Sequence, residues 1–382
     1  MSEPYAIVIA GGGPVGAALA LGLRDSSHRV ALLESRAVDT VTDDTRVIAL
    51  SHGSRLILER LGVWQALRDV TPIQTITVSQ QRRFGRVELT AAEARVPALG
   101  YVASYAALQR TLMSAVTGGG VDVLSGCTAR EFNSTADHAT VTVDDDGVTR
   151  HLLTSLLALA DGGESLRLAP MEERDYRQSA LVCDVISEAP HENRAFERFT
   201  PQGPLALLPT PRGWSLVWTA RQARANALAM LDDAQFNAEL QAAFGNLLGA
   251  LRVSGARQLF PLKLKHARRP GAPRVVLIGN AAQSLHPVAG QGFNLGLRDA
   301  WELARAVRDA HDPGDPLRIN TYFGERRFDR TATILFTDTL IRLFSNDIPL
   351  LDRLSSAGIS ALAAIPPAKN LLVRRMMFGA HG

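Results

Sequence analysis

The N-terminal region alternates between short apolar runs and segments rich in glycine or polar residues. Residues 5–10 form a continuous apolar run, residues 17–24 have the composition of a helix, and residues 30–34 form a second apolar run that ends in Glu34. Continuous apolar runs of this length are typical of strands buried on both faces of a parallel sheet. The pattern therefore predicts a strand, a loop, a helix and a second strand within about 30 residues.

A similar pattern returns closer to the C-terminus. The apolar run at 274–278 precedes a glycine-rich loop, and apolar residues at helical spacing follow this loop up to Val307. Asp299 lies on the opposite, polar face of the predicted helix. The pattern predicts a further unit of strand, loop and helix.

The middle of the chain has a different pattern, in which apolar and polar residues alternate. Alternation at 73–89 and in segments of 173–268 predicts antiparallel strands, with a helix at 234–244 inside the second stretch. The predicted fold class is α/β: a Rossmann-like nucleotide-binding domain, an inserted, mostly antiparallel β-sheet substrate domain and a C-terminal helical segment. We assign residues 1–72, 98–172 and 270–330 to the first domain, 73–97 and 173–269 to the second, and 331–382 to the C-terminal segment.

Composition and charge exclude several classes of protein. The 382 residues carry 41 basic and 38 acidic side chains, and the net charge of +3 is too small to predict a nucleic-acid-binding surface. Cys127 and Cys183 lack the spacing of a disulfide framework or a metal site, which favours two small buried side chains in a reducing compartment. Because no run of about 18 apolar residues occurs, we predict a cytoplasmic protein and leave peripheral contact with a membrane open.

The first glycine loop carries a dinucleotide-binding pattern. Gly11, Gly13 and Gly16 fit G-x-G-x-x-G between the first strand and its helix, with Pro14 in the first helical turn and Glu34 about 20 residues on. The glycines permit a tight turn, close approach of a pyrophosphate to the helix N-terminus, and close helix packing. An acid at the end of the second strand binds ribose hydroxyls and disfavours a 2′-phosphate, so FAD or NAD is favoured over NADP.

Two further blocks follow predicted strands. Asp161 and Gly162 come directly after the apolar run at 156–160, and the loop from Gly279 to Gly296 opens the helix that ends near Val307. Free N–H groups and a positive dipole at a helix start favour an electron-rich ligand, and glycines let that ligand approach the backbone. The alternative is that these glycines only form a tight turn.

These three blocks, in this order, resemble the single-component FAD-dependent aromatic hydroxylases, a class of flavoprotein monooxygenases, over nearly the whole chain. The resemblance implies FAD as the bound cofactor, NAD(P)H as a transient reductant, and oxygen transfer to a phenol through a flavin C4a-hydroperoxide. It also implies a set of cofactor-binding residues: Gly11, Gly13, Pro14, Gly16, Glu34, Arg46, Arg110, Asp161, Gly162, Gly279, Asn280, Pro287, Gly290, Gly292, Phe293 and Asn294. For Arg110 the alternative is an exposed charge on a helix.

Within this family the chain is most similar to the branch of ubiquinone biosynthesis, whose substrate is a polyprenylated methoxyphenol. Two stretches carry this similarity, residues 279–287 and residues 192–200 with 203–206 after them. The first is the sharper, because most relatives have Asp and His where this chain has Asn280 and Gln283. His286 and Pro287 are the catalytic candidates: His286 as the base that takes the phenol proton, or alternatively as a residue that only shapes the loop. Phe196, Phe199, Leu207, Trp218 and Phe260 are candidates for the substrate pocket, with ordinary core packing as the alternative.

Two other functions share these features. A flavin-dependent reductase or halogenase has the same fold, although the segment from Trp214 to Trp218 lacks the tryptophan spacing of a halogenase. A non-catalytic FAD-binding scaffold of a quinone-biosynthesis complex is the other alternative, motivated by the neutral Asn280 and Gln283. Apolar residues beside arginines in 331–382 favour contact with an anionic membrane surface that holds the prenylated substrate, or alternatively helices packed on the FAD domain.

Overall fold

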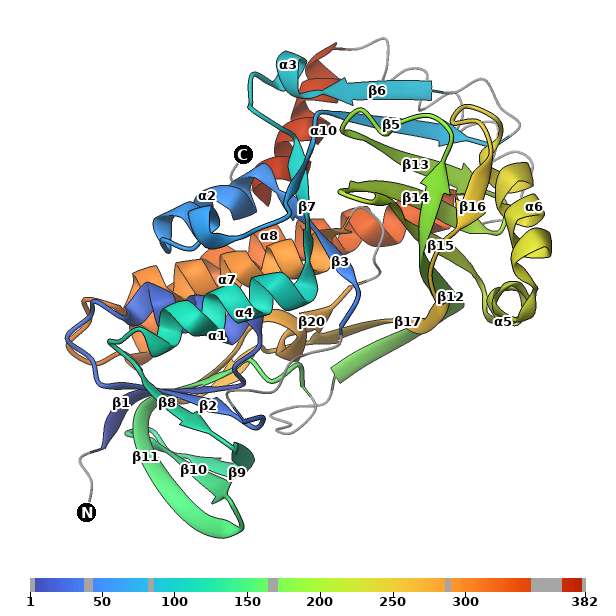
Figure 1. Cartoon of the computed structure of the whole chain (residues 1–382). Helices are drawn as coiled ribbons and strands as arrows, with labels where there is room; N and C mark the ends of the chain where they lie inside the picture. The colour runs from blue at the N-terminus through green and yellow to red at the C-terminus, as the bar shows by residue number, and fades with distance from the viewer. Residues whose placement is uncertain are drawn as a thin grey trace.

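The computed structural model describes residues 4–37, 44–81, 86–163, 171–285, 290–344 and 366–379. It contains two large sheets and one small sheet, with helices on one face of each large sheet and a helix near the C-terminus (Figure 1). The predicted fold class, α/β with a second, mostly antiparallel sheet, is confirmed. None of the described helices has both the length and the apolar composition needed to cross a bilayer.

The first large sheet has a parallel centre. Its strands β19, β11, β1, β2 and β8 are neighbours in this order and run parallel, as their continuous apolar runs predict. The long β11 extends into an antiparallel ribbon with β10 and β9, and β18 adds an antiparallel edge. The strands are β1 (Tyr5–Ala10), β2 (Val30–Glu34), β8 (Asp122–Ser125), β9 (Cys127–Ser134), β10 (Ala139–Asp145), β11 (Val148–Leu159), β18 (Gly271–Ala272) and β19 (Val275–Leu277).

Helices cover one face of this sheet and the β9–β10–β11 ribbon covers the other (Figure 1). The helices are α1 (Pro14–Leu23), α4 (Tyr105–Thr117), α7 (Gln291–Val307) and α8 (Pro316–Phe344). Alternate residues of β1 separate the two layers, since Ile7 and Ile9 face the helices and Val8 faces the ribbon. α1 begins three residues before its apolar run, because the fixed φ of Pro14 suits the first helical position.

The second large sheet is antiparallel apart from the parallel pair β13–β5. Helices α5 (Gln222–Met230) and α6 (Asp233–Phe244) cover its outer face, and Cys183 is buried in that core, as Cys127 is in the first sheet. The strands are β5 (Thr75–Gln80), β6 (Arg86–Thr90), β12 (Met171–Ser187), β13 (Arg194–Thr200), β14 (Gly203–Thr210), β15 (Gly213–Arg221), β16 (Leu251–Val253), β17 (Gln258–Ala267) and β20 (Gln283–Ser284).

A small antiparallel sheet joins the two large ones. Its strands are β3 (Val47–Ser51), β7 (Gly100–Ser104) and β4 (Thr71–Ile73), and it packs against the inner face of the second sheet at Ala195 and Leu208. The remaining elements are α2 (His52–Arg60), the single turn η1 (Trp64–Ala66), α3 (Ala91–Ala94), the turn η2 (Gly279–Ala281) and α10 (Pro366–Phe378), which packs between α2 and the β5–β6 hairpin (Figure 1).

Candidate active site

The structure brings the three predicted glycine and Asp-Gly blocks together at one edge of the parallel sheet. Gly11, Asp161 and Gly279 follow the carboxyl ends of β1, β11 and β19, which are adjacent parallel strands. A side chain on Gly11 would begin 2.7 Å from backbone atoms of Ala160 and Asp161, and one on Gly163 would begin 3.5 Å from the Cα atom of Ala281. These three loops therefore lie side by side, as the binding of one extended ligand across them requires.

The Gly11 loop leaves room for a pyrophosphate in front of α1. Gly11 has φ +111°, and a Cβ atom on Gly16 would lie 1.9 Å from the Gly11 carbonyl oxygen, so both positions require glycine. Gly13 precedes Pro14 as the N-cap of α1, and no described atom lies within 4 Å of the Cβ position on Gly13. In the described part of the chain no side chain caps this helix start, so its N–H groups suit an anion.

Glu34 lies directly beside this loop. A Cβ atom on Gly12 would lie 2.4 Å from Oε2 of the Glu34 carboxylate. The Arg36 backbone N–H donates to that carboxylate over 2.9 Å, and the Arg36 guanidinium donates to both oxygens over 3.0 and 3.1 Å. These bonds raise the pKa of Arg36 and fix the carboxylate, whose remaining lone pairs can accept from ribose hydroxyls.

Sequence reasoning missed Gln109, which precedes the predicted Arg110. The Gln109 side chain is buried, and its Nε2 donates to the Gly12 carbonyl over 2.5 Å. Its Oε1 has no hydrogen-bond partner among the described residues. Arg110 itself is exposed on α4. No periodic or motif signal distinguishes Gln109, since the contact depends on where α4 packs.

Arg46 lies where the small sheet meets the second large sheet. Its guanidinium donates to Asp44 over 2.5 to 3.1 Å and lies over the rings of Tyr105 and Phe260, 5.2 and 5.4 Å from their centroids. The pKa of Tyr105 is raised, mainly by burial, and the charges of Arg46, Asp44, Arg36 and Glu34 also act on it. Arg46 and Glu34 therefore border the same region of the site.

The start of α7 is built around the Asn294 side chain. Its Oδ1 accepts from the Ser51 backbone N–H (2.8 Å) and the Ser54 hydroxyl (2.6 Å). Its Nδ2 donates to the carbonyls of Ala49 (2.9 Å) and Gly290 (2.6 Å). Gly290 is left-handed at the N-cap, and a side chain on Gly292 would meet only Leu285, at 4.0 Å, among the described atoms. Asn294 thus fixes an open helix start next to β3.

The two unusual residues of the Gly279 loop differ in environment. Asn280 is exposed, whereas Gln283 is buried and donates from Nε2 to Oδ2 of Asp299 over 2.7 Å. Gln283 Oε1 has no hydrogen-bond partner within the described ranges. Asp299 also accepts from the Gly279 N–H over 3.4 Å. Gln283 therefore holds the loop to α7 while Asn280 stays accessible to a ligand.

The placement of Asp299 on an outward polar face was wrong. Asp299 is 4 % exposed, and Arg326 of α8, 5 % exposed, pairs with it over 2.8 Å. Arg326 also pairs with Asp329, which is bonded in turn to Arg298 over 2.9 Å. The two carboxylates raise the pKa of Arg326 although burial alone would lower it. Asp299 points inward because α8 packs against α7 and places the Arg326 guanidinium beside the Asp299 carboxylate.

Most of the aromatic pocket candidates belong to an ordinary core. Phe196, Leu207 and Trp218 pack against α5 and α6 on the outer face of the second sheet. Phe199 and Phe260 are not part of this core: Phe199 is buried and alternation turns it to the opposite face of β13 from Phe196, and Phe260 lies beside Arg46. Strand alternation instead turns Glu197 to the inner face, where burial raises the pKa of its carboxyl to about 7. Glu197 is half-buried there.

The residues present fit FAD. The uncapped start of α1, the carboxylate beside Gly12 and the open start of α7 match, in this order, a pyrophosphate, a ribose and a flavin ring. The described residues contain no group of three or more His, Cys, Asp or Glu side chains that would hold a metal ion. His286 and Pro287 lie outside the described residues.

Comparison with known proteins agrees with this geometry. The profile of a family described as FAD binding domain matches residues 4–336. The ubiquinone hydroxylase UbiL of Rhodospirillum rubrum is 33 % identical, over 97 % of this chain and 89 % of that protein. The 3-demethoxyubiquinol 3-hydroxylase of Escherichia coli is 31 % identical, over 94 % and 95 %. The crystal structure of p-nitrophenol 4-monooxygenase PnpA from Pseudomonas putida DLL-E4 shares the fold, with a TM-score of 0.80, 17 % identity and full coverage of both chains. The chain belongs to the FAD binding domain family and is an FAD-dependent monooxygenase of the aromatic hydroxylase type.

Proposed function

We propose that this enzyme hydroxylates the ring of 2-polyprenyl-6-methoxyphenol in ubiquinone biosynthesis. The similarity to ubiquinone hydroxylases over nearly the whole chain supports the pathway. The pair Asn280 and Gln283 supports this substrate, because the resemblance to the ubiquinone-biosynthesis branch rests partly on these two residues. Quinone analysis of cells lacking the protein tests the proposal: accumulation of 2-polyprenyl-6-methoxyphenol is expected, and accumulation of a different intermediate would reassign the ring position.

The proposed binding residues divide the cofactor into three parts. Gly11, Gly13, Pro14 and Gly16 hold the pyrophosphate, together with Arg46, Arg110 and the Asp161–Gly162 turn. Glu34 binds the adenosine ribose, and Gly279 and Asn280 bind the ribitol. The flavin ring would lie against the first turn of α7, whose N–H groups would stabilise negative charge on it. The residues proposed to contact the ring are Pro287, Gly290, Gly292, Phe293 and Asn294.

The bound flavin supplies the redox and oxygen chemistry, with NAD(P)H as a transient reductant. The protein aligns the phenol ring, excludes water and removes the phenol proton, since a phenolate accepts oxygen better than a phenol. We assign this base to His286, next to Pro287. The test is His286→Ala: the ratio of product formed to NAD(P)H consumed should fall, and an unchanged ratio removes His286 from this role.

The predicted domain division fits this function. Residues 73–97 and 173–269 would form the substrate domain, whose inner sheet face lies toward the flavin loops. The polyprenyl substrate lives in a membrane, so we place the enzyme in the cytoplasm at the inner membrane surface, in contact with other proteins of ubiquinone biosynthesis.

The proposed membrane-contacting surface lies on α8. Phe328 and Leu335 are 57 % and 64 % exposed one heptad apart, and the Arg375 guanidinium lies 5.3 Å from the Phe328 ring centroid. Phe328→Ser with Leu335→Ser should reduce sedimentation with anionic liposomes. Truncation before residue 369 is a poorer test, because α10 packs on the core.

A scaffold without catalysis is the second candidate. The observation that favours it is the neutral pair Asn280 and Gln283. Asn280 is the exposed member of this pair, and its neutral amide binds a ribitol hydroxyl less strongly than a carboxylate would, by up to about 1.5 kcal/mol. The visible spectrum of the purified protein separates the two functions. A yellow protein whose NAD(P)H oxidation is stimulated by the phenol is a hydroxylase, whereas a colourless protein that cannot be reconstituted with FAD is a scaffold.

A further inference from the structure

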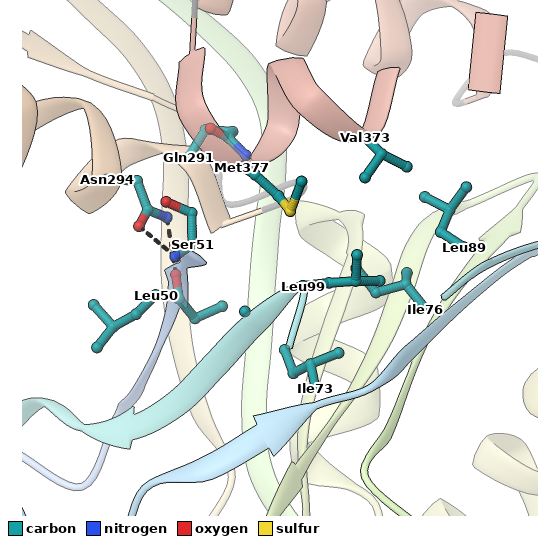
Figure 2. A pocket seen from close by; sticks show the side chains of 12 residues that line it. Leu50, Ser51, Ile73, Ile76, Leu89, Leu99, Gln291, Asn294, Val373 and Met377 are labelled. Atoms are coloured by element: carbon teal, nitrogen blue, oxygen red, sulfur yellow. Dashed lines mark hydrogen bonds between the residues drawn. The ribbon is translucent and has the colours of Figure 1, made fainter. Parts of the chain in front are cut away.

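An apolar pocket lies beside the first turn of α7, between the small sheet, the β5–β6 hairpin and α10 (Figure 2). Its volume is about 60 Å³. At one end Asn294 is bonded to Ser51, and at the other Val373, Leu89 and Ile76 gather (Figure 2). Because α7 and β3 are also the proposed walls of the flavin site, this pocket and the flavin site share a boundary.

The chemistry of the lining selects a hydrocarbon. The polar side chains at the α7 end are already engaged: Asn294 makes four hydrogen bonds, the Ser51 hydroxyl bonds Ser54, and Gln291 has a partner. A buried water needs two to four polar partners, which this lining does not offer among the described residues. The rest of the lining is carbon and one sulfur, from Leu50, Ile73, Ile76, Leu89, Leu99, Val373 and Met377.

One wall of the pocket is thin. α10 contributes only Val373 and Met377, which belong to a small core cluster with the β5–β6 hairpin rather than to the main core. Lys369 pairs with Glu93 over 2.8 Å near the start of α10, and Phe378 contacts the His52 ring at 5.8 Å near its end. α10 is therefore held at both ends, by Lys369 at its start and by close packing of its last turn against α2, where a Cβ atom on Gly53 would lie 2.6 Å from the Met377 carbonyl oxygen. The movable part of this wall is the Met377 side chain, which is flexible.

We propose that this pocket binds the first isoprene units of the substrate's prenyl chain, with Met377 of α10 as the side chain that moves to admit them. The inference rests on the proposed function and adds a subsite to it. The present volume equals about two water molecules, so a five-carbon unit requires a new Met377 rotamer. The phenol ring then lies at the flavin, and the chain passes beside the first turn of α7 into the pocket and leaves beneath α10.

The test fills the pocket and compares two probes that share a ring. Val373→Phe narrows the pocket, and Leu371→Phe on the same helix is the control, since Leu371 is 57 % exposed. The probes are 2-farnesyl-6-methoxyphenol and 2-methoxy-6-methylphenol. We expect Val373→Phe to lower kcat/KM and to weaken binding of the farnesyl probe by about tenfold or more, with the methyl probe within about twofold of wild type. Leu371→Phe should match wild type with both probes.

Two results would overturn the subsite: equal losses for both probes, or an undiminished affinity for the farnesyl probe. FAD content and thermal unfolding check that the Val373→Phe variant is folded. If this variant does not fold, Ile76→Phe fills the pocket from the opposite wall. Wild-type enzyme that hydroxylates neither probe refutes the proposed function instead. The dissociation constant of the farnesyl probe, measured for wild type and variant, still decides the subsite in that case.

Discussion

The buried ion pair between α7 and α8 gives the strongest prediction. Arg326→Met removes the guanidinium that pairs with Asp299 and Asp329, both almost fully buried, and leaves their charges without this partner. Asp299 in turn holds the Gly279 N–H and Gln283 of the flavin loop. The substitution therefore perturbs both folding stability and the loop that is proposed to bind the ribitol.

The magnitude follows from the geometry. Two unit charges 2.8 Å apart attract each other by about 6 kcal/mol at an effective dielectric constant of about 20. Desolvation offsets much of this attraction, and loss of one partner from a buried pair typically costs about 3–5 kcal/mol. With an unfolding entropy of about 0.8 kcal/mol/K for 382 residues, Tm should fall by about 4–6 °C.

The assay is thermal unfolding together with FAD titration, and Arg305→Met is the matched control. Arg305 pairs with Glu302 on the exposed face of α7 over 3.0 Å, so its removal should cost under about 0.5 kcal/mol. Arg326→Met should also weaken FAD binding, whereas Arg305→Met should not. The reasoning is refuted if both variants unfold at the same temperature and bind FAD equally well.

Three further predictions test other parts of the structure. Gly13→Ala should leave the stability of the apoprotein unchanged, because Gly13 has φ −61° and no described atom lies near its Cβ position, but it should weaken FAD binding. Gly16→Ala should destabilise the apoprotein itself, because the added Cβ atom would lie 1.9 Å from the Gly11 carbonyl oxygen. Glu197 has its folded pKa raised from 4.5 to about 7, so its neutral form adds stability that is present below pH 4.5 and is lost as pH rises through 7. Glu197→Gln should therefore stabilise the protein by about 3 kcal/mol at pH 8 but by under about 1 kcal/mol at pH 5, and equal Tm differences at both pH values would contradict this. Gln109→Leu should lower FAD affinity by removing the bond to the Gly12 carbonyl, and titration with FAD that gives the wild-type constant would exclude a role for this bond.

The parts of the fold predicted best are those in which local pattern and tertiary burial agree. The strands β1 and β2 match the apolar runs at 5–10 and 30–34 because both faces of each strand are buried, so every residue carries the signal. The small sheet of β3, β4 and β7 was not predicted. Its strands have three to five residues, which is too short for a periodicity to emerge.

The candidate site divides in the same way. Backbone requirements, such as φ +111° at Gly11, leave glycine in the sequence and are therefore visible there. Pairwise requirements are not visible: Asp299 looks like a surface residue until Arg326, 27 positions later, is known to face it. Gln109 similarly becomes meaningful only when α4 packs on the Gly11 loop.

The same distinction between backbone, pairwise and ligand-facing roles separates Asn280 from Gln283, the two neutral residues of the Gly279 loop. Gln283 donates one hydrogen bond to Asp299, and an imidazole at this position has an N–H that could serve the same purpose, so Gln283→His should conserve the link between loop and helix. Asn280 is exposed at the sheet edge, where a change from carboxylate to amide acts on the ligand rather than on the fold. The effects of the two substitutions on FAD affinity should therefore be independent. Gln283→His should leave FAD affinity within about twofold of wild type, and Asn280→Asp should strengthen FAD binding. Coupling between the two, measured in a double-mutant cycle of FAD dissociation constants, would show that Gln283 acts on the ligand as well.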